Sequence, residues 1–201
     1  MIVTKIIGIT GPTGAGKTTA LGALRELGAW MIDADEVYHR LLEESAPLRE
    51  ALTARFGDIQ DKSGKIDRKK LGNVVFGDPT ALSDLNAITH RFIGEEIDRQ
   101  LSAARAEDRS AAAIDAIALI ESGLGDRCDA VVGVIAPAEL RVRRIMAREG
   151  IPEDYAWKRV NAQQGEEFFR THCDYLLENT EHDTPESFRA RALVLFTDIL
   201  S

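Results

Sequence analysis

The chain has 201 residues, of which 44% are hydrophobic and 29% are charged. This composition fits one compact body with a substantial core and excludes a disordered or collagen-like chain. Lys and Arg number 25 against 33 Asp and Glu, a net charge of -8, so we expect no general electrostatic grip on nucleic acid or membranes. Two cysteines, no membrane-length apolar run and a strand-like start predict a cytoplasmic protein with reduced thiols.

The first third of the chain begins with the order strand, glycine loop, helix, strand. Residues 5–10 form a short β-branched run that ends at a glycine, and apolar residues recur at helical spacing over 17–27. Gly28 is a suitable residue to end that helix, and residues 29–32 make a second short strand. We expect the ligand-binding edge of a sheet to lie at the ends of these strands.

The segment from 36 to 105 lacks strand character and reads as several helices. Gly57 and the polar stretch 61–65 predict a turn, while Asp67 and Asp78 are suitable residues to start helices. This segment is therefore predicted to be an all-helical insertion.

Strands and helices alternate again after the insertion. The predicted strands are 111–115, 130–136 and 175–177, and the predicted helices are 137–148, 153–171 and 186–200. Near-continuous apolar strands are typical of a parallel sheet that is buried on both faces. The fold class is therefore α/β, a parallel sheet flanked by helices.

The segment Gly11–Thr18 matches the phosphate-binding pattern GxxxxGK[ST] between a predicted strand and a predicted helix. Glycines let backbone amides converge on phosphate, with Lys17 pairing with the β- and γ-phosphates and Thr18 binding Mg²⁺. With this loop, the α/β sheet flanked by helices is predicted to be of the P-loop NTPase type. The motif alone does not separate kinases, GTPases and motor ATPases. The predicted ATP-binding residues are Gly14, Ala15, Gly16, Lys17, Thr18 and Thr19.

Asp33 lies at the end of the second strand, where open α/β sheets bind their ligands. A kinase needs a carboxylate there to orient an acceptor hydroxyl and to accept its proton. Asp is also a good cap for the helix that is predicted to begin near Asp35. Both roles stay open at this point.

Arg141, Arg144 and Arg148 fall on one face of the helix that follows Pro137. Arg144 and Arg148 are candidates to stabilise the charge of a transferring phosphoryl group. The alternative for this face is a solvated surface paired with carboxylates, and we expect that alternative for Arg141.

Several segments together resemble the dephospho-CoA kinase family. Residues 9–19 are followed by Glu26-Leu-Gly-Ala29, Ile32-Asp-Ala-Asp35, Arg55-Phe-Gly57, Gly64-Lys-Ile-Asp-Arg68, Ile88-Thr-His90 and Glu121-Ser-Gly-Leu124, with Arg144, Arg148, Gln163 and Asn179. This combination covers nearly the whole chain. It implies an enzyme that phosphorylates the ribose 3′-hydroxyl of dephospho-CoA with ATP and Mg²⁺, the last step of coenzyme A biosynthesis.

The resemblance also implies a division of labour. Asp33 is the general base, and the insertion holds dephospho-CoA with Asp33, Arg68 and His90 as its contacts. The expected domains are a nucleotide-binding core of residues 1–35, 109–138 and 173–201, the insertion 36–108 and a helical lid 139–172. Asp115, which ends an apolar strand, resembles a Walker B carboxylate that holds Mg²⁺ through water, although it is equally suited to cap a helix.

Four positions depart from the family pattern. Thr13 replaces an aliphatic residue, Arg91 stands where Pro follows the histidine, Ile117 replaces Pro, and Phe169 replaces a Lys for which Arg170 is a possible substitute. They keep two alternatives open, a related kinase of another nucleotide or small metabolite and a nucleotide-binding switch without turnover. The expected partner is one small-molecule substrate, with no nucleic acid or membrane, and the oligomeric state is not predicted.

Overall fold

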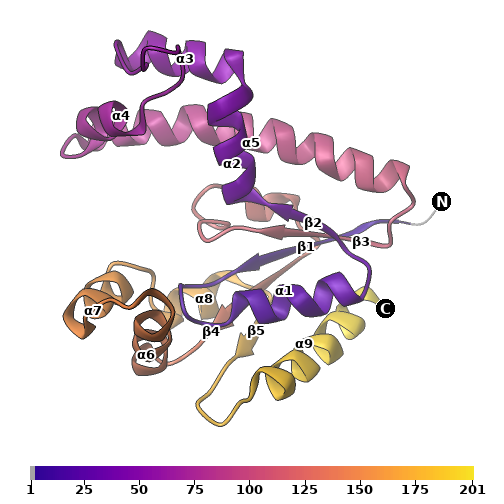
Figure 1. Cartoon of the computed structure of the whole chain (residues 1–201). Helices are drawn as coiled ribbons and strands as arrows, with labels where there is room; N and C mark the ends of the chain where they lie inside the picture. The colour runs from indigo at the N-terminus through magenta and orange to yellow at the C-terminus, as the bar shows by residue number, and fades with distance from the viewer. Residues whose placement is uncertain (1–2) are drawn as a thin grey trace. The chain divides into compact units, whose positions relative to one another are not determined.

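The computed structural model describes residues 3–201 and contains a five-stranded sheet in the order β2-β3-β1-β4-β5 (Figure 1). The strands are β1 (Lys5–Thr10), β2 (Trp30–Asp33), β3 (Ala111–Asp115), β4 (Ala130–Ile135) and β5 (Tyr175–Glu178). The pairs β1–β3, β1–β4 and β4–β5 are parallel. The predicted α/β class with a parallel sheet is confirmed.

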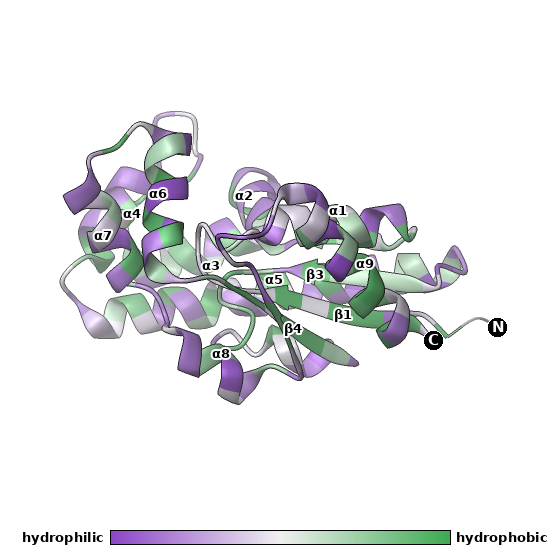
Figure 2. Ribbon diagram, turned by 90° about the horizontal axis from the view of Figure 1, so that it is seen from below, coloured by the Kyte–Doolittle hydropathy of each residue, from purple (hydrophilic) through white to green (hydrophobic). Residues whose placement is uncertain are grey.

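The central strands are buried because their sequences are apolar throughout. All six residues of β4 and the last five of β1 are buried, and Figure 2 shows these strands in the colour of hydrophobic residues. Helices α1 (Lys17–Glu26) and α9 (Pro185–Leu200) pack together, and their side chains share one core cluster with the sheet. This core fixes the carboxyl end of β1, from which the glycine loop departs.

Three further α-helices follow β4 along the chain. They are α6 (Ala138–Glu149), α7 (Glu153–Asn161) and α8 (Glu166–His172), and a short 3-10 helix, η1 (Leu124–Arg127), precedes β4. Helices α6 and α7 share a small apolar cluster that includes Val142, Ile145 and Val160. The single helix predicted for 153–171 is wrong, because the chain leaves helical geometry after Asn161 and begins α8 only after Gly165.

The chain divides into two compact units, one of residues 1–32 and 103–201 and the other of residues 33–102. The second unit holds α2 (Ala34–Glu44), α3 (Ala46–Phe56), α4 (Arg68–Val75) and most of α5 (Pro79–Ala106). Its helices enclose a separate core around Leu48, Leu52 and Ile59. Asp33, Ser45 and Asp67 cap three of these helices, as short polar side chains do at helix starts.

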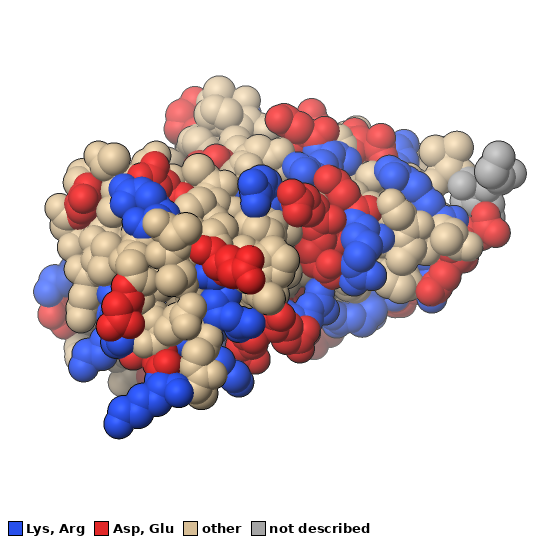
Figure 3. All heavy atoms as spheres, turned by 90° about the horizontal axis from the view of Figure 1, so that it is seen from above, with Lys and Arg blue, Asp and Glu red and all other residues tan. Residues whose placement is uncertain are grey.

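None of the helices in residues 3–201 is long and apolar enough to cross a membrane. On the face of the molecule shown in Figure 3, acidic and basic side chains are interspersed over the surface. Any strong attraction for phosphate on this face therefore has to come from a local arrangement of donors.

Candidate functional site

The glycine loop leaves β1 at Gly11 and enters α1 at Gly16, and both positions require glycine. Gly11 has a φ of 141°, and a Cβ atom there would lie 2.1 Å from the backbone oxygen of Val134. Gly16 has a φ of 107°, and a Cβ atom would lie 2.4 Å from Nδ2 of Asn179. The loop therefore runs against β4 and the end of β5 more closely than any side chain permits.

The backbone amides of the loop fall into two groups. The amide of Ala15 donates to the oxygen of Pro12 at 3.2 Å, and that of Thr19 donates to Gly16 at 3.0 Å. Within the described residues, no protein acceptor is recorded for the amides of Gly14, Gly16, Lys17 and Thr18, whereas the amide of Thr13 donates to the side chain of Gln163. Unpaired amides at a helix N-terminus form a ready site for an anion such as phosphate.

Lys17 points its charge to the end of a neighbouring strand. Its Nζ atom lies 2.6 Å from Oδ1 of Asp115, and both side chains are largely buried. The register explains the contact, because Asp115 pairs with Ile9 of β1, just before the loop. A cavity of 320 Å³ opens here, lined by Pro12, Thr13, Gly14, Gly16, Lys17, Thr18, Ile117, Arg144 and Arg148.

The donors available for Mg²⁺ are oxygens of the type that this ion prefers. Thr18 is exposed and lines the cavity, and the Asp115 carboxylate lies beside Lys17 at the same strand ends. Residues 3–201 contain no cluster of three or more acidic, His or Cys ligands. Mg²⁺ in a kinase is usually held by one or two protein oxygens together with substrate phosphates, so this donor set fits it.

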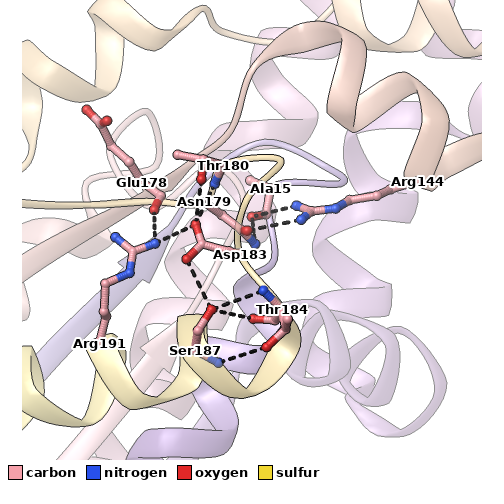
Figure 4. Close-up of polar contacts among 9 residues, drawn as sticks. All are labelled: Ala15, Arg144, Glu178, Asn179, Thr180, Asp183, Thr184, Ser187 and Arg191. Carbon is pink, nitrogen blue, oxygen red and sulfur yellow. Dashed lines mark hydrogen bonds and ion pairs between the residues drawn. The ribbon is translucent and has the colours of Figure 1, made fainter.

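Arg144 holds the outer side of the loop together with a buried asparagine (Figure 4). Its Nη1 atom donates to the oxygen of Gly14 at 3.2 Å, and its Nη2 atom donates to Oδ1 of Asn179 at 3.0 Å. Asn179 in turn donates from Nδ2 to the oxygen of Ala15 at 3.0 Å. Burial lowers the pKa of the Arg144 guanidinium.

The turn between β5 and α9 forms a second cavity of 200 Å³ beside Gly16 and Thr19. Asp183 orders this turn by accepting hydrogen bonds from Thr180 and from Arg191 (Figure 4). These bonds, first of all the one from the Thr180 amide, lower the pKa of Asp183 to about 2. The turn is therefore held by a carboxylate that stays charged at physiological pH.

Arg141 is not the solvated surface residue that we expected. It is only 5% exposed, and its Nε atom donates to the backbone oxygen of Thr13 at 3.0 Å. Helix α6 turns this side chain toward the loop because Val142 and Ile145 face the apolar cluster on the neighbouring side. The expectation was wrong because the sequence does not show which helix face packs on the loop.

Arg148, one turn after Arg144, is exposed and lines the larger cavity. Its Nη2 atom lies 2.6 Å from Oε1 of Glu149, which also pairs with Arg159 of α7. Hydrogen bonds from these two arginines lower the pKa of Glu149. Arg148 therefore reaches the cavity while its charge is shared with a carboxylate.

Asp33 is an exposed residue that caps α2. Its Oδ1 atom accepts hydrogen bonds from the amides of Asp35 at 2.9 Å and Glu36 at 3.0 Å. The capping role that the sequence allowed is therefore confirmed. Because both bonds end on one oxygen, Oδ2 is the atom through which the carboxylate can act on a substrate.

Arg68 and His90 both belong to the second unit but have different surroundings. Arg68 is exposed at the start of α4, and its Nη2 atom lies 2.9 Å from Nδ1 of His39. His90 is half-buried on α5, and burial lowers the pKa of its imidazole. The helix continues without a break past Arg91, so the missing proline leaves regular helical backbone at the histidine.

Two further departures, Ile117 and Phe169, also lie in the first unit. Ile117 is 43% exposed and lines the larger cavity and a further cavity of 300 Å³. Phe169 is buried and lines the 300 Å³ cavity. Arg170 forms ion pairs with Glu166 and Glu178, so its charge is already partnered in this structure.

Sequence reasoning assigned no role in this site to Thr13, Asn179, Asp183, Arg141 or Gln163. Asn179 is buried at 5% exposure, which is unusual for a polar residue and marks a fully used hydrogen-bonding position. Its sequence signals are its match to the family pattern noted above and its place directly after the last strand, at the edge of the sheet where ligands bind.

A family model described as dephospho-CoA kinase matches residues 5–184. A dephospho-CoA kinase of Thermobifida fusca is 34% identical over 96% of this chain and 95% of its own length, and one of Corynebacterium diphtheriae is 38% identical over 88% of each. The solved dephospho-CoA kinase of Campylobacter jejuni is 28% identical over 98% of both chains, with a TM-score of 0.71.

A shikimate kinase of Bacteroides thetaiotaomicron shares the fold with a TM-score of 0.53 at 17% identity. A kinase of a different acceptor therefore has this fold, and the fold alone does not select the acceptor. The family match and the whole-length relatives decide among them, and they confirm the resemblance noted in the sequence: the chain belongs to the dephospho-CoA kinase family.

Proposed function

We propose that this chain transfers the γ-phosphoryl group of ATP to the ribose 3′-hydroxyl of dephospho-CoA, which is the last step of coenzyme A biosynthesis. Membership of the dephospho-CoA kinase family supports this reaction. The single structural observation that carries it is the glycine loop, where four amides without a recorded acceptor among residues 3–201 and the Lys17 ammonium lie around one cavity. That arrangement suits a polyphosphate and stabilises the charge of a transferring phosphoryl group.

The phosphate half of the site is assigned to the first unit. The free amides of Gly14, Gly16, Lys17 and Thr18 hold phosphate oxygens, and the Lys17 ammonium neutralises their charge. Ala15 and Thr19 contribute shape, because their amides are already bonded within the loop. Mg²⁺, held by Thr18 and through water by Asp115, would supply further neutralisation of the phosphate charge.

Arg144 and Arg148 of α6 are assigned different roles at the phosphate cavity. Arg144 anchors the outside of the loop and also lines the cavity, so it positions the loop and adds positive potential. Arg148 is exposed, and its partner Glu149 can release it when a more highly charged group enters the cavity. We assign residues 139–172 as a lid that carries both arginines, with Gly150 as its flexible point.

The acceptor half is assigned to residues 36–108, with Asp33 at their start. Asp33 orients the 3′-hydroxyl and accepts its proton through Oδ2, while Oδ1 keeps α2 capped. Arg68 is the cation for an anionic group of the acceptor, and His90 offers a neutral imidazole to it. The remaining segments 1–35, 109–138 and 173–201 form the nucleotide-binding core, and the enzyme is assigned to the cytoplasm.

The direct test is an acceptor panel with purified protein, ATP and Mg²⁺. Dephospho-CoA is expected to be phosphorylated far better than adenosine, AMP or shikimate, because a large acceptor gains remote contacts that position its hydroxyl. ADP release and the phosphorylated product are both measured. If a small nucleoside outperforms dephospho-CoA, the proposed acceptor is wrong; if only slow ATP hydrolysis appears, the chain is a nucleotide-binding switch.

A further inference from the structure

One residue of the glycine loop, Thr13, has all of its polar groups bound by two side chains from outside the loop. Its amide donates to Oε1 of Gln163 at 3.1 Å, and its hydroxyl accepts from Nε2 of Gln163 at 3.0 Å. Its backbone oxygen accepts from Nε of Arg141 at 3.0 Å. The Thr13 amide is thus occupied by protein, unlike the amides of Gly14 and Gly16 that follow it.

The two outside side chains are also bound to each other. Nη2 of Arg141 donates to Oε1 of Gln163 at 2.7 Å, so this oxygen accepts from both Arg141 and Thr13. Arg141 is buried, and its hydrogen-bond partners within the described residues are these two neutral oxygens. A buried cation without a carboxylate partner costs free energy, so its retention here favours a role for its positive charge beside the loop.

Two of these three residues line cavities. Thr13 lines the 320 Å³ cavity together with Lys17, Gln163 lines the 300 Å³ cavity, and Pro12 lines both. The backbone of α6 is packed against the loop at the same point, because a Cβ atom at Gly14 would lie 3.0 Å from the backbone oxygen of Arg141. A displacement of Gln163 would therefore alter the shape of the phosphate cavity.

We infer that Gln163 and Arg141 are positioning residues that clamp Thr13 and thereby set the shape of the phosphate-binding loop before ATP arrives. We call Thr13, Arg141 and Gln163 the Thr13 clamp. The clamp rests on the proposed function, because the loop it shapes is the one assigned to the ATP phosphates. It adds a role for two residues outside the motif. Arg141 lies on α6, and Gln163 lies on the segment after α7.

The clamp contributes to ATP affinity by removing the cost of ordering the loop. A loop that samples other conformations binds ATP only in the fraction of molecules that have the right shape. Removing the Gln163 carboxamide breaks three hydrogen bonds at once and leaves the buried Arg141 with one fewer partner. We expect this loss to weaken ATP binding by about tenfold while the acceptor affinity stays unchanged.

The first experiment compares Gln163→Met with Gln164→Met, its exposed neighbour, as a matched control. Isothermal titration with a non-hydrolysable ATP analogue and Mg²⁺ measures Kd, and steady-state assays give KM for ATP and for dephospho-CoA. The expected result is a Kd and an ATP KM raised about tenfold in Gln163→Met alone. The KM for dephospho-CoA should stay as in the unsubstituted protein.

A second set of variants acts on the other partner of the clamp. Thr13→Val removes the hydroxyl at constant shape and should raise the Kd for the ATP analogue about threefold. Thr13→Ser keeps the hydroxyl and should keep the affinity of the unsubstituted protein. In the Thr13→Val background, Gln163→Met should cost less than it does alone, because one of its bonds is already gone. These small changes also test the clamp if Gln163→Met fails to fold.

The clamp is overturned if Gln163→Met and Thr13→Val bind the ATP analogue with unchanged Kd, even if their melting temperatures fall, because the contacts then serve stability alone. It is also overturned if Gln163→Met raises the KM values for both substrates together, or if Thr13→Ser binds the ATP analogue as weakly as Thr13→Val does. The proposed function fails in a different way, when the unsubstituted protein binds the analogue but does not phosphorylate dephospho-CoA.

Discussion

The two halves of the proposed site differ in how their side chains are held. In the first unit, Arg144 and Asn179 bind the loop through partly or fully buried hydrogen bonds, and Lys17 is paired at the strand ends. In the second unit, Asp33 and Arg68 are exposed, and their recorded contacts are to nearby helical residues. The phosphate half is thus built in advance, whereas we expect the proposed acceptor half to gain its contacts from the acceptor.

This difference follows from what each half has to bind. Phosphates are small and alike in every nucleotide, so a rigid set of amides and one lysine suffices and costs little to order. A large acceptor offers many groups, and its binding energy can position one hydroxyl at Asp33. Substitutions in the first half should therefore affect ATP, and those in the second half should affect transfer or the acceptor.

The largest expected effect comes from Lys17→Ala. Removing the ammonium should lower kcat by about 10³-fold, because this charge is assigned to the transferring phosphoryl group. Asp115 then loses its ion-pair partner, so the melting temperature should be followed alongside the activity. Lys158→Ala on the exposed face of α7 is the control. Unchanged turnover with ATP would reject the loop assignment.

Asp33→Asn is expected to lower kcat by about 10²-fold or more while the Kd for ATP stays constant. The amide oxygen preserves the cap of α2 but cannot accept the hydroxyl proton. Asp78→Asn is a matched control, since Asp78 likewise accepts from the amides of Thr80 and Ala81 at the start of a helix. If ATP affinity collapses and transfer stays high, Asp33 serves the fold or the metal rather than the proton.

A smaller effect is expected for His90→Gln, which should raise the KM for dephospho-CoA by about tenfold and leave the Kd for ATP unchanged. The imidazole is half-buried on an unbroken helix, so glutamine keeps a polar group of similar size there. Steady-state kinetics in both substrates measure the split, with His172→Gln on α8 as the control. Equal changes in both KM values would assign His90 to stability instead.

The smallest effect concerns pH and the turn that Asp183 orders. Its pKa is lowered to about 2, so the stabilisation is complete above the ordinary value of 3.8 and is lost as pH falls through about 2. Asp183→Asn should therefore lower the melting temperature by about 2–4 °C at pH 7, with the gap closing toward pH 2. Calorimetry at several pH values measures this gap, and a constant gap would contradict the assignment.

The sequence predicts the sheet well because its strands are short apolar runs with clear ends. Strand β1 lies at Lys5–Thr10 and β3 at Ala111–Asp115, as expected from their β-branched and apolar residues. The break between α7 and α8 was missed because Gln163, Gln164 and Gly165 interrupt a pattern that otherwise continues at helical spacing. These three residues are a weaker signal for a break than the helical periodicity on either side of them is for a continuous helix.

The candidate site could be predicted only where a motif fixes the positions. The glycine loop has such a motif, and a strand-end position marked Asp33 and Asp115. The burial of Arg141 depends on which face of α6 meets the loop, a long-range packing choice that a periodic pattern does not record. The contact between Thr13 and Gln163 joins residues 150 positions apart and has no local signal.

The central claim is that the phosphate loop is formed before ATP binds, and residue-resolved amide hydrogen exchange tests it most directly. In the free protein, the amides of Thr13 and Ala15 should exchange slowly because they are bonded to Gln163 and Pro12. The amides of Gly14, Gly16, Lys17 and Thr18 should exchange fast until an ATP analogue slows them. The claim is contradicted if all six exchange fast in the free protein and slow together when the analogue binds.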